Sequence, residues 1–335
     1  MTLRTLWTVA LLATAVCANT ARAETITIKL ATLAPDGSSW HEALKDLAAR
    51  WSKASSGRVQ LKIYAGGVAG DETSVTSKMR IGQFGAALIT AHGLISISEY
   101  VRAFSLPRAI RSYDELEFAL DRLAPELRRR LADKGFVAIE FADAGMVRLF
   151  VPEPTTDVDR VRRFKLFTWA GETAGPKLWA RAGFNVVPLA STEVMTGLQT
   201  GLIDAIPTTP TIALASQWYA SLPVLIDMPI APLVGAIVFT RGSWERIPPE
   251  LRPTLEEEAR STVLRMREDN RRLEREAIEA MRKRGMQVLV PTAGELERWN
   301  ALAEEANRGA RGDYLPAEAY DDLQRVLAAY RAGGR

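Results

Sequence analysis

The most constraining feature of this chain is a regular alternation of strand-like and helix-like runs from Glu24 to about Phe239. The strand-like runs of the first half are residues 26–31, 59–64, 86–89 and 137–141. Such alternation is typical of an α/β fold with a largely parallel sheet. Ligands of such sheets bind beyond the carboxyl ends of the strands, so we expect the loops after Ala31, Ile89 and Phe141 to face one crevice.

A second series of strand-like and helix-like runs begins at Lys165, and a chain of 335 residues exceeds what one hydrophobic core usually fills. Both observations predict two lobes. A helical run without glycine follows Pro248 and Pro249 and continues to about Arg284, roughly 50 Å at 1.5 Å per residue, which is long enough to span both lobes. The predicted boundaries are 24–146 with about 236–266 for lobe I, and 147–235 with about 267–335, including the C-terminal helices, for lobe II.

The N-terminus has the pattern of a cleavable secretory signal. A basic start is followed by an apolar run from Leu6 to Val16 and by small residues at Ala21 and Ala23. The run is shorter than the roughly 20 apolar residues that a membrane-spanning helix needs. We therefore predict that residues 1–23 are removed after Ala23 and that the mature chain is periplasmic. The single cysteine, Cys17, lies within this segment, so we expect no disulfide and no thiol chemistry in the mature protein.

Charge and motif content argue against several function classes. The 43 basic and 40 acidic residues nearly balance, which is unlike a nucleic-acid-binding protein. The two histidines, His41 and His92, do not have the spacing of a metal site, and we find neither a phosphate-binding loop nor a Gly-x-Ser-x-Gly motif. We therefore predict a protein that is not an enzyme and that needs no metal or cofactor. His92 follows a strand end, where a ligand contact and an ordinary loop residue are equally consistent with the sequence.

Several local signatures resemble the DctP-type substrate-binding proteins of TRAP transporters, the tripartite ATP-independent periplasmic transporters. The resemblance covers essentially the whole chain after residue 23. The matching stretches are Ser55-Ser56-Gly57-Arg58-Val59, Gly70-Asp71-Glu72, Thr192-Glu193-Val194, Gly197-Leu198-Gln199-Thr200-Gly201-Leu202-Ile203-Asp204 and Trp244-Glu245-Arg246-Ile247-Pro248-Pro249-Glu250-Leu251. The resemblance implies a two-lobed periplasmic binding protein of the Venus-flytrap type, which closes on a small molecule and delivers it to a TRAP-type membrane permease.

Departures from the family pattern concern the ligand. Family members usually carry an arginine that pairs with the substrate carboxylate at the end of a Lys-Ile-Arg strand. Here the run is Lys165-Leu166-Phe167, so Phe167 replaces that arginine. Arg148 matches a second arginine of the family only after a one-residue gap, and a solvated arginine is an equal alternative. The changes predict a ligand that is less polar than usual or lacks the carboxylate.

The predicted ligand-binding residues are Leu33, Glu72, Ala91, His92, Arg148, Phe167, Trp169 and Thr208. For Trp169, stacking on the ligand competes with core packing between strand and helix. Glu72 begins a predicted helix, where an acidic residue is favoured in any case. Three alternatives to a transport receptor remain: a periplasmic enzyme with Glu72 or His92 as its base, a ligand-sensing subunit, and a receptor that hands a hydrophobic cargo to a partner protein.

Overall fold

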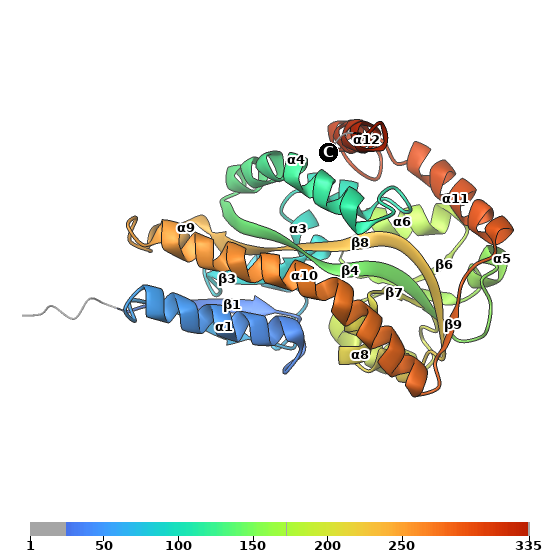
Figure 1. The fold of residues 1–335 in the computed structure, drawn as a ribbon, viewed down its shortest axis with the longest axis horizontal. Helices are drawn as coiled ribbons and strands as arrows, with labels where there is room; N and C mark the ends of the chain where they lie inside the picture. Colours follow the sequence, from blue (N-terminus) through green and yellow to red (C-terminus); the bar gives the residue numbers. More distant parts are fainter. Residues whose placement is uncertain (1–24, 172, 334–335) are drawn as a thin grey trace, which may run out of the picture.

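The computed structural model describes residues 25–171 and 173–333 (Figure 1). The predicted signal peptide and Cys17 lie outside these residues. Within them, one sheet of seven strands has the order β2-β1-β3-β8-β4-β7, with β9 paired to β8, and a second sheet contains β5 and β6. The strands are β1 (Ile26–Thr32), β2 (Val59–Tyr64), β3 (Ala86–Thr90), β4 (Phe136–Val151), β5 (Lys165–Trp169), β6 (Asn185–Leu189), β7 (Ile206–Thr208), β8 (Val224–Thr240) and β9 (Gln287–Leu289).

The prediction of a largely parallel sheet is wrong. Strands β1, β2 and β3 are parallel, but β8 is antiparallel to both β3 and β4, and β4 is antiparallel to β7. Phe141 is not followed by the expected loop, because it lies within β4, a strand of 16 residues that continues to Val151. Its register shifts between Asp143 and Met146, around Gly145 at φ 100°. A glycine with positive φ interrupts the strand pattern in the sequence without ending the strand.

Helices and single turns connect and cover these strands. In the first half they are α1 (Ser39–Ala54), α2 (Glu72–Arg80), α3 (Ala91–Ile95), η1 (Glu99–Ser105), α4 (Tyr113–Asp133), α5 (Val158–Val161) and α6 (Ala174–Arg181). In the second half they are η2 (Ser191–Glu193), α7 (Val194–Gln199), α8 (Pro210–Ala215), η3 (Trp218–Ala220), α9 (Arg241–Glu245), α10 (Arg252–Lys283), α11 (Ala293–Arg308) and α12 (Ala317–Arg331). None of the helices in the described part of the chain combines the length and apolar character that a membrane crossing requires.

Separate hydrophobic clusters divide the molecule into two lobes. Lobe I contains β1 to β3 and α1 to α4, with α1 and α10 on one face of the sheet and α4 on the other (Figure 1). On the first face Trp51 stacks on Phe239, with ring centroids 5.4 Å apart. Lobe II contains β5 to β7 and α5 to α8, and its core includes Phe150, Phe167 and Val194. Strands β4 and β8 pass through both lobes and join them.

The predicted long helix is present as α10. Its 32 residues, about 48 Å at 1.5 Å per residue, begin at Arg252, slightly later than predicted. It contacts α1 and β4 in lobe I and α8 and β9 toward lobe II, so it spans both lobes as predicted. The last helix differs from the expectation. Helix α12 packs against α4 and η1 of lobe I, because Leu323 and Leu327 join the core cluster around Leu116. The remaining lobe boundaries stay a prediction.

Candidate functional site

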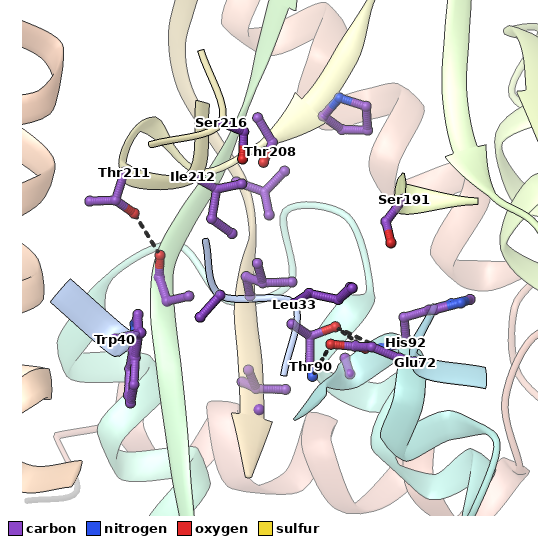
Figure 2. Close-up of a pocket in the computed structure, with 18 of the residues that line it drawn as sticks. Leu33, Trp40, Glu72, Thr90, His92, Ser191, Thr208, Thr211, Ile212 and Ser216 are labelled. Atoms are coloured by element: carbon purple, nitrogen blue, oxygen red, sulfur yellow. Dashed lines mark hydrogen bonds between the residues drawn. The ribbon is translucent and has the colours of Figure 1, made fainter. Parts of the chain in front are cut away.

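A cavity of about 810 Å³ lies between the two lobes. Lobe I lines it with the segment after β1 and with the end of β3 and the start of α3 (Figure 2). Lobe II contributes the end of β5 and helix α8, and the crossing strands β4 and β8 supply residues from both lobes. The crevice predicted beyond the strand ends is therefore present, although β4 enters it as a continuous strand.

The structure brings seven of the eight predicted site residues to this cavity. They are Leu33, Glu72, Ala91, His92, Phe167, Trp169 and Thr208. Several lining residues were missed by the sequence reasoning: Trp40, Thr168, Trp179, Ser191, Thr211, Ile212, Ser216 and Trp218. A signal for part of this set existed, because Thr209 followed by Pro210 has the pattern of a helix start, and α8 begins there.

Arg148 does not line the cavity. Its Nε donates to Asp227 Oδ1 at 2.6 Å, and its Nη1 lies 2.8 Å from Glu274 Oε1. Burial by itself lowers the pKa of Arg148, but the two carboxylates outweigh it and raise the pKa above its ordinary value. Glu274, on α10, also accepts a hydrogen bond from the hydroxyl of Tyr113 at 2.7 Å. Arg148, Asp227, Glu274 and Tyr113, which we call the hinge cluster, thus connect β4, β8, α10 and α4 where the strands cross between the lobes.

Glu72 is a fixed part of the cavity wall. Its carboxylate is 1% exposed and accepts hydrogen bonds from the backbone N–H and hydroxyl of Thr90 and from the Gly93 N–H, at 2.7 to 2.8 Å. A Cβ on Gly93 would lie 3.0 Å from Glu72 Cβ, so only glycine fits this close approach. Burial raises the pKa of Glu72 despite these hydrogen bonds. Its bonding capacity is used within lobe I, which favours a structural role for this carboxylate.

Four residues join the lobes at one edge of the cavity, and we call them the closure contact: Asp71, His92, Trp169 and Ser191. The His92 ring of lobe I stacks on the Trp169 ring of lobe II, with centroids 4.7 Å apart. Asp71 Oδ2 accepts hydrogen bonds from the Ser191 N–H at 2.6 Å and from its hydroxyl at 2.8 Å. Burial by itself raises the pKa of Asp71, but His92 nearby and the Ser191 hydrogen bonds outweigh it and lower the pKa to about 2.

Phe167 belongs to the cavity wall and to the lobe II core at once. Its side chain is 1% exposed and packs in the cluster that contains Val194 and Leu198. Its ring also meets the Trp169 ring edge-on, with centroids 5.2 Å apart. Trp169 lines the cavity and packs on protein side chains, so core packing is present and stacking on a ligand stays a prediction.

The charges that face the cavity are acidic. Among the described residues, its lining contains no lysine or arginine, and its carboxylates belong to Glu72, Asp143 and Glu276. Asp143 Oδ1 accepts a hydrogen bond from the Gly145 N–H at 3.1 Å, and burial raises its pKa. Glu276 is exposed at the mouth and is paired with Arg272 at 3.0 Å. A carboxylate ligand would therefore find no lysine or arginine in the described part of this lining.

The described residues also contain no cluster of three or more side chains suited to holding a metal ion. His92, one of the two bases considered from the sequence, has its Nε2 3.5 Å from Asp71 Oδ1 and its ring against Trp169. The His92 side chain thus takes part in the contact between the lobes, whereas the Glu72 carboxylate is hydrogen-bonded within lobe I. The geometry therefore gives the site the features of a binding cleft.

Comparisons with known proteins agree with this geometry. The model of a family described as DctP, bacterial extracellular solute-binding protein, family 7, matches residues 30–310. An uncharacterized protein of Haemophilus influenzae is 22% identical over 310 residues, which are 90% of this chain and 91% of the relative. A solute-binding protein of Chromohalobacter salexigens is 23% identical over 247 residues, 72% of this chain and 71% of the relative.

Solved structures share the fold at low identity. A sugar acid-binding protein of Advenella mimigardefordensis in complex with galactonate has a TM-score of 0.85 at 16% identity, covering 92% of this chain and 99% of that one. A TRAP periplasmic solute-binding protein of Desulfovibrio salexigens with bound orotic acid has a TM-score of 0.84 at 15% identity and the same coverage. A Bordetella pertussis extracytoplasmic solute receptor that binds pyroglutamic acid has a TM-score of 0.82 at 16% identity, covering 90% and 99%. The predicted two-lobed fold is thereby confirmed.

Proposed function

Because this chain belongs to the DctP family of bacterial extracellular solute-binding proteins, we propose that it is a receptor that captures a small molecule between its lobes and delivers it to a TRAP-type membrane permease. A ligand that touches both lobes binds the closed form better and shifts the population toward it. The proposed receptor acts in the periplasm after cleavage behind Ala23 and carries out no chemistry on its ligand.

The ligand lacks the carboxylate that the solutes in the related structures carry. This proposal rests on the cavity lining. Among the described residues, the lining contains no lysine or arginine but includes Glu72 and Asp143. A buried carboxylate needs a paired cation or several hydrogen-bond donors, and nearby negative charges raise the free-energy cost of burying it further. Galactonate, orotic acid and pyroglutamic acid, the ligands of the related structures, are all carboxylic acids. Phe167 and the neutralised Arg148 leave such acids without a partner here.

The test is mass spectrometry of compounds that copurify with the protein from its own cells, followed by a melting-temperature assay with each compound and with galactonate and orotate. We expect a compound without a carboxylate that raises the melting temperature and is recovered unchanged. Galactonate and orotate should leave the melting temperature where it is. Conversion of the bound compound would contradict the receptor function, whereas tight binding of either acid would contradict only the proposed ligand class.

A further inference from the structure

The cavity is large and has an aromatic lining. Its volume of about 810 Å³ lies toward the upper end of the roughly 300–1,000 Å³ that enclose drug-sized ligands. Four of the eight tryptophans of the chain line it: Trp40, Trp169, Trp179 and Trp218. The lining extends from Trp179 on α6, which packs against one core cluster of lobe II, to Trp218 at η3, which packs against another. It also includes Ala280 on α10. A small polar acid would leave most of this lining in contact with water.

Several polar groups in the lining are hydrogen-bonded within the protein, whereas Thr168 Oγ1 and His92 Nε2 are buried without a hydrogen-bond partner among the described residues. Thr90 donates its hydroxyl to Glu72, and Ser191 donates its hydroxyl to Asp71. Thr32 accepts a hydrogen bond from the Ala34 N–H at 3.2 Å. The hydroxyl of Thr211 donates to the Ala144 carbonyl at 3.4 Å, as Figure 2 shows. The lining therefore offers a ligand mainly apolar and aromatic surface, together with a few polar atoms that have no hydrogen-bond partner in the protein.

We infer that the ligand is an uncharged, predominantly apolar molecule, larger than the acids of the related structures, whose body extends along the cavity toward α8 and α10. This inference rests on the proposed receptor function and specifies its ligand class. Water in a cavity with such a lining is poorly held, so its displacement by apolar surface favours binding. A net charge of either sign lowers affinity, because the described lining offers an anion no lysine or arginine and its buried carboxylates are already hydrogen-bonded.

The test uses ligands that share one apolar chain and differ in the head group. Octan-1-ol, octanoate and octylammonium are titrated while tryptophan fluorescence is followed, since four tryptophans line the cavity. Hexan-1-ol and decan-1-ol give the length dependence. We expect octan-1-ol to bind at least about tenfold more tightly than either charged ligand. Affinity should rise about fourfold for each added methylene.

A variant locates the apolar body. Ala280→Phe narrows the end of the cavity at α10, so the affinity ratio of decan-1-ol to hexan-1-ol should fall at least about fivefold. The matched control is Ala301→Phe, an exposed position of α11 outside the lining, which should keep the ratio. Melting curves check that both variants fold.

Tighter binding of octanoate than of octan-1-ol, or an affinity independent of chain length, would overturn the inference and leave the receptor function standing. No response to the alcohols would also overturn it. The receptor function itself fails if no copurifying compound binds or if the bound compound is converted.

Discussion

The cavity lining and the hinge cluster directly beside it have opposite chemistry. The lining has large apolar and aromatic surfaces and no lysine or arginine among the described residues, whereas the hinge cluster contains Arg148, Asp227, Glu274 and Tyr113. Each charged group of the cluster is paired within the cluster. The comparison teaches that an arginine near a binding cleft is not by itself a ligand-binding group, because two carboxylates neutralise this one before a ligand arrives.

The largest loss of stability is expected from a substitution that breaks the ion pairs of the hinge cluster. Arg148→Met leaves the buried Glu274 carboxylate without its cation, and such a loss usually costs about 3–5 kcal/mol of stability. Chemical denaturation measures this change. Because Arg148 does not line the cavity, ligand affinity of the folded fraction should stay within about twofold. The control, Arg272→Met on the exposed face of α10, should leave the unfolding midpoint unchanged. A large loss of affinity at unchanged stability would place Arg148 in ligand binding after all.

A substitution that adds a cation to the cavity tests the ligand class that we inferred from the lining. Phe167→Arg removes a buried ring from the lobe II core, which is expected to cost roughly 2–4 kcal/mol of stability, and adds the guanidinium that the family resemblance led us to expect there. Galactonate should then raise the melting temperature, whereas we expect no such rise in the unchanged protein. Phe167→Leu is the matched control, since it also removes the aromatic ring but adds no charge. Equal responses of the two variants to galactonate would refute the role assigned to position 167.

A smaller loss of affinity is expected from weakening the closure contact, which joins the lobes at one edge of the cavity. Ser191→Ala removes the hydroxyl that donates to Asp71 at 2.8 Å, a hydrogen bond to a charged group that is typically worth about 1.5–3 kcal/mol. The closed form should lose population, and ligand affinity should fall about tenfold. Small-angle scattering with and without ligand measures the closed fraction. Ser216→Ala, also in the lining, should have little effect, since no hydrogen bond of its side chain is seen among the described residues.

The smallest effect is a pH dependence of closure. The pKa of Asp71 is lowered from 3.8 to about 2 in the closed form, so its contribution is fully present above pH 3.8 and is lost as the pH falls through about 2. Scattering between pH 5 and pH 2 should show progressive opening on acidification. Asp71→Asn should flatten this part of the pH profile. An unchanged profile in that variant would show that other carboxylates control the opening.

Most elements of the fold could be predicted from local patterns, because strand-like runs and helical spacing depend on neighbouring residues. The first three strands, helix α4 and the long helix α10 were found in this way. The antiparallel course of β4 and β8 could not be predicted, since strand direction depends on pairing between residues about 90 positions apart, such as Phe141 with Ala236. The position of α12 on lobe I depends in the same way on distant contacts.

For the site, the sequence by itself determined which residue types stand at the strand ends, and with them the absence of the expected arginine at Phe167. Only the tertiary structure decided what the remaining groups do. Arg148 pairs with Asp227 and Glu274, because the fold brings these carboxylates of β8 and α10 close to it. Glu72 accepts a hydrogen bond from Thr90, because the end of β3 lies next to it. Electrostatic pairing acts over a few ångströms and not over sequence distance, so the fold neutralises an arginine that the sequence shows only as a charge.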